Sequence, residues 1–170
     1  TKTASYVKLL EGTGTKILDT RKTTPGIRAI EKWAVVIGGG ENHRFALYDM
    51  VMLKDNHIDF AGGLHQAIDK TTSYLKQHDL DLKIIVEARD LNEVSEILKH
   101  HNIHRILLDN FSLEDTRKAV AMVGNQTKTE SSGGINEENM RAYAECGVNY
   151  ISSGALTHSI YNLDLSLKAI

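Results

Sequence analysis

Short apolar runs alternate with longer mixed segments along most of the chain. Runs of this length, bounded by polar residues, are typical of strands in a parallel sheet that is covered on both faces. They predict strands at Lys16–Thr20, Val51–Asp55, Leu82–Ala88, Arg105–Asn110, Thr127–Ser132 and Asn149–Ser153.

The segments between these runs carry the signals of amphipathic helices. Asp90 followed by Glu93 predicts a helix start of the capping-box type, and Ser112 predicts the start of the next helix. Asn136 is expected to cap a third helix, which Gly147 ends. Two further helices are predicted at residues 27–37 and from Gly63 to about His78.

The spacing of the strands predicts the class of fold. The last four are separated by roughly 20–25 residues, enough for one helix each, which is typical of βα units. A complete eight-unit barrel takes about 250 residues, so 170 residues leave room for about six units. We therefore predict an α/β fold, an incomplete (β/α) barrel-like domain similar to a TIM barrel. Residues 38–49 are expected to form a loop.

Composition narrows the class of protein. Hydrophobic residues make up 41% of the chain and charged residues 25%, so the chain can bury a core. The formal charge of −2 argues against nucleic acid as a partner. The single cysteine, Cys146, is expected to be a buried inert thiol and suits a reducing compartment. Because no apolar run is long enough to span a membrane and no signal peptide is recognisable, we expect a cytoplasmic protein without a membrane partner.

Each predicted strand ends in polar residues. Ligands of parallel α/β sheets and barrels bind at the carboxyl ends of the strands, so these residues are expected to share one face. A basic group among them is expected to hold a polyanionic substrate, because Arg matches carboxylate or phosphate with a rigid fork and Lys supplies a compact charge. The basic group consists of Arg21, Lys22, His43, Arg44 and Lys54.

Two acidic residues near the strand ends form a group of opposite charge. Glu87 and Asp109 offer hard oxygen ligands, which suit Mg²⁺ that is shared with substrate phosphates. Alternatively, one of them forms a structural ion pair with Lys54 or Arg21. The two interpretations are compatible, because an ion pair can rest in place until substrate arrives.

Two glycine turns follow the last two predicted strands. Each leads from a strand towards a helix, where glycine allows close approach to the backbone and amide N–H groups attract anions. One such turn is often only a turn, but two at matching positions favour a phosphate site. The turns are Ser132, Gly133 and Gly134, and Ser153, Gly154 and Ala155.

Other conspicuous residues have simpler interpretations. Gly38 is expected to end the preceding helix, although the flexible run of three glycines at residues 38–40 could also let the loop close over a ligand. The histidines at residues 100–104 are expected to be solvated, and Trp33 is expected to be a packing residue. No Ser-His-Asp or Cys-His arrangement is recognisable, so covalent hydrolase chemistry is not expected.

The strand-end motifs occur in a recognisable order. Residues 17–30 are ILDTRKTTPGIRAI and residues 38–58 are GGGENHRFALYDMVMLKDNHI. VEA, LDN, SGGI and ISSGALTH follow at residues 86–88, 108–110, 132–135 and 151–158. Over nearly the whole chain, these segments are similar to quinolinate phosphoribosyltransferase, also called nicotinate-nucleotide pyrophosphorylase (carboxylating).

The resemblance implies a reaction of NAD synthesis. Phosphoribose would pass from phosphoribosyl pyrophosphate to the ring nitrogen of quinolinate, giving nicotinate mononucleotide, pyrophosphate and CO₂. The basic group would hold the quinolinate carboxylates, except that Lys22 would face phosphoribosyl pyrophosphate, and the glycine turns would take the 5′-phosphate. Mg²⁺ is the implied cofactor, with Glu87 and Asp109 at the ribose and pyrophosphate end, and no organic cofactor is expected. The implied catalytic residues are Lys22, Lys54, Glu87 and Asp109.

Members of this family are longer than the chain. The resemblance implies that residues 1–170 are the C-terminal barrel-like domain, without the N-terminal α/β sandwich domain and the start of the barrel. It also implies a homodimer or a higher homo-oligomer, in which the N-terminal domain supplies a basic residue to the partner's quinolinate site. Two alternatives stay open: a non-catalytic fragment that binds a phosphate ligand, and a phosphoribosyltransferase homologue with a different acceptor.

Overall fold

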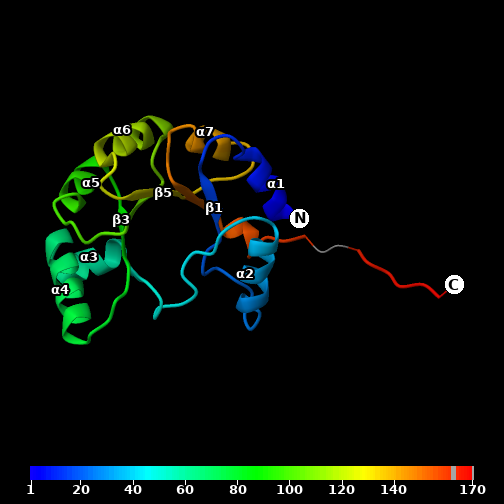
Figure 1. Cartoon of the computed structure of the whole chain (residues 1–170), viewed down its shortest axis with the longest axis horizontal. Coiled ribbons are helices and arrows are strands. Elements are labelled where there is room, and N and C mark those ends of the chain that lie inside the picture. The colour runs from blue at the N-terminus through cyan, green and yellow to red at the C-terminus, as the bar shows by residue number, and fades with distance from the viewer. Residues whose placement is uncertain (162–163, 170) are drawn as a thin grey trace.

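A computed structural model describes residues 1–161 and 164–169 of the chain. Strands form an inner layer and most helices cover it from outside (Figure 1). The helices are α1 (Lys2–Leu9), α2 (Arg28–Ile37), α3 (Asp55–Ala61), α4 (Leu64–Gln77), α5 (Leu91–Ile97), α6 (Leu113–Val123) and α7 (Met140–Ala144). The strands are β1 (Lys16–Leu18), β2 (Val51–Leu53), β3 (Ile84–Ala88), β4 (Arg105–Asp109), β5 (Lys128–Ser132) and β6 (Tyr150–Ser152), and a short 3₁₀ helix, η1 (Gly154–Leu156), follows β6.

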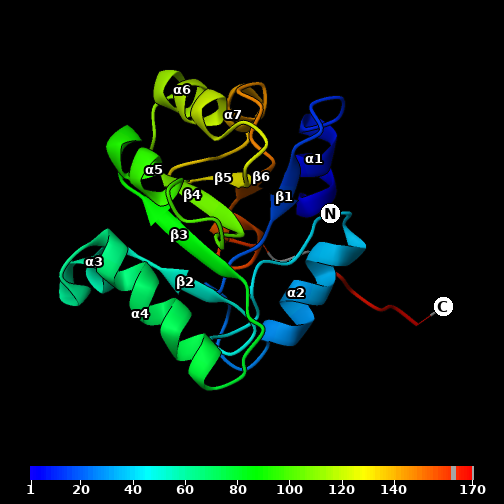
Figure 2. The same ribbon diagram turned by 60° about the vertical axis from the view of Figure 1, so that its left-hand side comes forward.

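The described strands form one parallel sheet in the order β1-β6-β5-β4-β3-β2. Figure 2 allows the sheet to be followed from β2 round to β1. The last strand lies beside the first, with Ile17 opposite Ile151, whereas a doubly wound sheet places its first strand inside the sheet. This strand order, with six strands in the described part of the chain, confirms the predicted incomplete α/β barrel.

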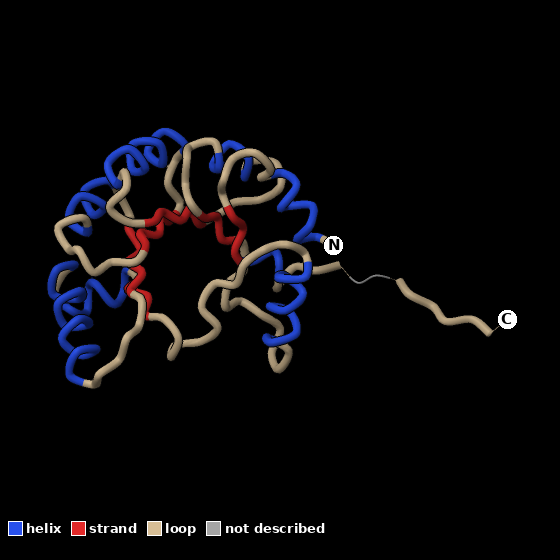
Figure 3. The backbone as a smooth tube through the Cα atoms, in the orientation of Figure 1, coloured by secondary structure: helices blue, strands red, loops and turns tan. Residues whose placement is uncertain are grey.

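The barrel is open between β1 and β2. Within residues 1–161 and 164–169 these two strands do not pair, and the loop before β2 crosses the opening (Figure 3). A parallel bridge between Leu18 and Glu41 attaches the loop to β1. Gly38 ends α2, as predicted, and it also lets α1 approach closely, since a Cβ at this position would lie 2.5 Å from the Cβ of Thr3.

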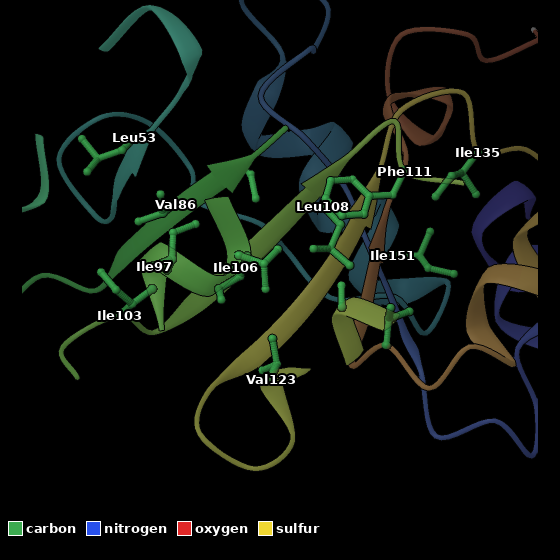
Figure 4. Packing of buried hydrophobic residues seen from close by; sticks show 14 of the residues in the cluster. Leu53, Val86, Ile97, Ile103, Ile106, Leu108, Phe111, Val123, Ile135 and Ile151 are labelled. Atoms are coloured by element: carbon green, nitrogen blue, oxygen red, sulfur yellow. The ribbon is translucent and has the colours of Figure 1, made fainter. Parts of the chain in front are cut away.

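The main apolar core lies between the sheet and the outer helices. Because side chains alternate between the two faces of a strand, Val86, Ile106 and Leu108 point outward into this core (Figure 4). They are completely buried, and burial of each such side chain contributes about 1.5–3 kcal/mol. The same alternation directs the intervening residues of β3 and β4 towards the inside of the barrel.

All predicted strands are present, each within its predicted range, and most predicted helix starts are correct. Asp90 accepts a hydrogen bond from the backbone N–H of Glu93 at 2.9 Å, and Ser112 accepts one from Asp115 at 3.0 Å. The prediction for Asn136 was wrong, because its side chain accepts the backbone N–H of Glu138 in a turn and α7 begins only at Met140. Side-chain bonds to nearby backbone compete with helix formation in this way.

Two other expectations were wrong. Trp33 is 65% exposed on α2 instead of packing in a core. The side chain of His100 is 16% exposed, and its Nε2 lies 2.7 Å from Nδ1 of His65 on α4, so it is not a solvated histidine. In both cases the sequence shows the residue type but not which neighbouring element lies beside it.

Candidate active site

A cavity of about 790 Å³ opens at the carboxyl ends of the strands. Loops that follow β1, β2, β4, β5 and β6 form its wall, so residues far apart in the sequence lie side by side. Every site residue predicted from the sequence lines this cavity. These are Arg21, Lys22, His43, Arg44, Lys54, Glu87, Asp109, Ser132, Gly133, Gly134, Ser153, Gly154 and Ala155.

The basic group gathers beside the opening of the barrel. Arg21 and Lys22 follow β1, and Lys54 follows β2. Arg44 comes from the loop that crosses the opening, and burial and the nearby charge of Arg21 lower its pKa below the usual value of arginine. Two guanidinium groups close together suit a cavity that receives an anion.

A buried ion pair anchors the loop that carries His43 and Arg44. Lys32 on α2 and Asp19 after β1 are almost fully buried, with Nζ 2.5 Å from Oδ1. The same carboxylate oxygen accepts the backbone N–H of His43 at 2.8 Å, and Lys32 donates to the carbonyl oxygen of His43 at 3.0 Å. The polar end of β1 therefore has a structural role as well as its place beside the site.

Lys54 and Glu87 form an ion pair across the cavity wall. The distance between Nζ and Oε2 is 3.0 Å, and the Lys54 side chain is 47% exposed whereas that of Glu87 is 8% exposed. His57 accepts the backbone N–H of Lys54 at 3.0 Å, which fixes the backbone from which the lysine side chain extends. The alternative that a strand carboxylate pairs with Lys54 is thus confirmed.

Asp109 ends β4 and is held by the next residue. Asn110 donates from Nδ2 to Oδ2 of Asp109 at 2.8 Å, and its backbone has a φ of 54°, a left-handed conformation that asparagine tolerates. Gly133, with a φ of 93°, lies directly against Asn110, because a Cβ there would be 2.1 Å from its Oδ1. The carboxylate and the first glycine turn are therefore packed as one unit.

The second glycine turn is joined to the end of β1. Ser153 donates its backbone N–H to the carbonyl oxygen of Leu18 at 3.0 Å, and Thr157 donates its hydroxyl to the carbonyl oxygen of Lys22 at 2.6 Å. The turn after β6 is thereby held next to the basic group.

Several cavity residues were not predicted as site residues. Glu130 lies in the middle of β5, opposite Leu107, which is in turn opposite Glu87. These residues form one inward-facing row, and strand alternation counted from Glu87 and Asp109 was the signal that could have found them. The others are Thr20, Met52, Asn110, Ile135, Ser152 and His158.

The fold and the site together define a class of protein. A barrel-like parallel sheet carries, at the carboxyl ends of its strands, basic residues, carboxylates and glycine turns in separate parts of one cavity. This is an α/β barrel-type domain suited to a multiply charged, phosphorylated ligand. Within residues 1–161 and 164–169, none of the helices combines the length and apolar character that crossing a membrane requires.

Comparison with known proteins identifies the family. The model of the family described as "Quinolinate phosphoribosyl transferase, C-terminal domain" matches residues 1–168, and the chain belongs to this family. The chain is 46% identical to the chloroplastic nicotinate-nucleotide pyrophosphorylase [carboxylating] of Arabidopsis thaliana, over 89% of the chain and 48% of that protein. It is 41% identical to the probable nicotinate-nucleotide pyrophosphorylase [carboxylating] of Bacillus subtilis, over 98% of the chain and 56% of that protein.

A solved structure agrees with this assignment. The crystal structure of nicotinate-nucleotide pyrophosphorylase from Ehrlichia chaffeensis matches with a TM-score of 0.90 at 41% identity, covering 96% of this chain and 58% of that one. The chain spans about half the length of the curated relatives it matches.

Proposed function

We propose that the protein is a quinolinate phosphoribosyltransferase that makes nicotinate mononucleotide, pyrophosphate and CO₂ from quinolinate and phosphoribosyl pyrophosphate. The observation that carries the proposal is the convergence of basic residues, carboxylates and glycine turns on one cavity in a member of this family. Its relatives are named for this reaction.

The basic group supports the acceptor end. Quinolinate carries two carboxylates, and Arg21, Arg44 and Lys54 border both the main cavity and an adjoining cavity of about 620 Å³. Guanidinium forks match carboxylates bidentately, and Lys54 adds a mobile charge that exchanges its Glu87 partner for the substrate. We infer that the acceptor binds where the two cavities meet.

The carboxylates support the ribose and the leaving group. Loss of pyrophosphate from the anomeric carbon builds positive charge on the ribose ring, which the carboxylates of Glu87 and Asp109 stabilise electrostatically. Lys22 borders the same cavity and offsets negative charge on the departing pyrophosphate. The glycine turns at residues 132–134 and 153–155 take the 5′-phosphate, because glycine lets the phosphate reach the backbone.

The donor set fits Mg²⁺ that arrives with the substrate. Glu87 and Asp109 supply carboxylate oxygens, but among the described residues no group of three or more His, Cys, Asp or Glu can hold a metal ion. Mg²⁺ commonly binds through one or two carboxylates together with substrate phosphates and water. When bound, it neutralises charge on the pyrophosphate.

The reaction proceeds without a covalent enzyme intermediate. The lone pair of the quinolinate nitrogen forms the bond to the anomeric carbon, and the bond to pyrophosphate breaks with its electron pair on the leaving oxygen. The ring nitrogen is then cationic, so its positive charge stabilises the electron pair left on C2 when the bond to CO₂ breaks. That carbon takes up a proton, and nicotinate mononucleotide results.

We also propose a homodimer that works in the cytoplasm. The apolar face that α2 exposes, with Ile30, Trp33 and Ile37 each more than 60% exposed, supports association with a second copy. A buried free thiol, Cys146, suits a reducing compartment. Sedimentation of the full-length protein and its fractionation from cells test these two points.

The test of function uses the full-length protein that contains this chain. Incubation with quinolinate, phosphoribosyl pyrophosphate and Mg²⁺ should release CO₂ and form nicotinate mononucleotide. Product with nicotinate or another pyridine carboxylate, but not with quinolinate, would instead indicate a homologue with a different acceptor. Phosphate-ligand binding without any product would overturn the enzymatic proposal.

A further inference from the structure

The carboxylate of Glu130 lies below the basic group, and the proposed reaction does not use it. The side chain is fully buried, and its Oε1 has no hydrogen-bond partner among residues 1–161 and 164–169. Its Oε2 lies 2.6 Å from Nη1 of Arg105, whose guanidinium lies 4.1 Å from the centre of the Tyr150 ring. Barrel interiors are usually filled by apolar side chains, and a buried ion pair rarely adds stability over them, so this pair suggests another role.

The surroundings of Glu130 favour its ionised form. Burial opposes the charged form, but the nearby His43 ring and the Arg105 guanidinium outweigh burial and hold the pKa of Glu130 below the usual range. A fixed negative charge therefore lies under the loop that carries His43 and Arg44.

His43 is held on both its backbone and its ring. Asp19 and Lys32 bind its backbone N–H and carbonyl oxygen. Its Nδ1 accepts the backbone N–H of Arg44 at 2.7 Å, and its Nε2 lies 3.4 Å from Oε2 of Glu130. The His43 ring thus lies between the carboxylate in the barrel and the backbone of a basic-group residue, and its Nε2 has no hydrogen-bond partner among the described residues.

This arrangement selects one form of the imidazole. Because Nδ1 accepts a hydrogen bond, the ring proton lies on Nε2, where it faces Glu130. A second proton would have to displace the Arg44 N–H from Nδ1. His43 therefore presents an N–H, and not a lone pair, to Glu130.

We propose that Glu130 is a positioning residue for the acceptor site. It fixes the Nε2–H tautomer and the orientation of the His43 ring and, through this ring, it positions the backbone of Arg44. Carboxylates that orient a histidine from behind act in the same way in other sites. The inference rests on the proposed function only in taking quinolinate as the ligand of the basic group.

The test shortens the side chain at position 130 without removing its carboxylate charge. Glu130→Asp withdraws the carboxylate from His43 by one methylene, and Glu145→Asp is the matched control on the exposed end of α7. Side-chain ¹⁵N spectra of His43, assigned with His43→Gln, report the position of the ring proton. Steady-state kinetics of the full-length protein report the KM for each substrate.

We expect Glu130→Asp to shift the His43 spectrum towards a mixture of the two neutral forms. The KM for quinolinate should rise about tenfold, whereas that for phosphoribosyl pyrophosphate should change less than about twofold. The control should change neither. An unchanged His43 spectrum, or an equal rise in both KM values, in a folded variant overturns the proposal.

A second variant keeps the proposal testable if Glu130→Asp does not fold. Glu130→Gln combined with Arg105→Met removes both buried charges, and the same spectral and kinetic shifts are expected. If the full-length protein has no turnover at all, the proposed function fails. The His43 spectra still decide whether Glu130 sets the form of the ring.

Discussion

Gly133→Ala should strongly destabilise the protein, because the new methyl group has no room. Its Cβ would lie 2.1 Å from Oδ1 and 2.9 Å from the backbone nitrogen of Asn110. Asn110 cannot easily move away, since its side chain donates to Asp109 and its backbone N–H donates to the carbonyl oxygen of Ser132 at 2.9 Å.

The magnitude follows from two contributions. A φ of 93° costs an alanine about 1–2 kcal/mol relative to glycine, and overpacking costs about 1–3 kcal/mol. The free energy of unfolding should therefore fall by roughly 2–5 kcal/mol. Gly12→Ala is the matched control, because Gly12 has a φ of 80° but no atom within 4 Å of an added Cβ, so only the conformational cost of about 1–2 kcal/mol applies.

Urea unfolding, followed by far-UV circular dichroism, measures these differences as shifts of the midpoint. The slope of the free energy of unfolding against urea concentration should stay the same. Adding Asn110→Gly to Gly133→Ala should recover part of the loss, because it removes the side-chain contact at 2.1 Å and leaves the backbone contact at 2.9 Å. Equal midpoints for Gly133→Ala and Gly12→Ala would show that Asn110 does not restrict the space at Gly133.

Three further predictions follow from the same structure. Lys54→Ala should abolish turnover while the protein stays folded, since the Lys54 side chain itself is half exposed; near-normal turnover would contradict its role. Asp19→Asn should lower the free energy of unfolding in urea by about 3–5 kcal/mol, because it leaves Lys32 buried without a counter-charge. Asp19→Asn combined with Lys32→Met should lower it less. A double variant no more stable than the single one would contradict this expectation. Burial raises the pKa of Cys146, so a thiol reagent at mildly alkaline pH should modify it much faster in urea than in the folded protein, and equal rates would show that the thiol is accessible.

The positions of the strands and the face that carries the site could be predicted because both depend on local patterns. A buried strand needs consecutive apolar residues, and Ile84–Ala88 and Arg105–Asp109 lie where such runs occur. Polar groups at the ends of parallel strands meet at one edge whatever the length of the connections, so Glu87 and Asp109 share one cavity.

Features that depend on contacts between distant segments could not be predicted. The ion pair between Glu130 and Arg105 depends on the register that places Glu130 opposite Leu107 on the inside of the barrel. The exposure of Trp33 depends on which face of α2 meets the sheet, and the late start of α7 depends on a turn held by Asn136.

Residue order is enough to predict the alternation of strand and helix, the chemistry at the strand ends and the resemblance to a phosphoribosyltransferase family. Three features depend on the folded chain: β6 lies beside β1, the barrel is open beside β2, and His43 has its backbone held by Asp19 and Lys32 and its ring beside Glu130. Those features arise from the curvature of the sheet and from burial. An unpaired charge costs far more free energy inside the protein than in water, so each buried charged group needs a partner.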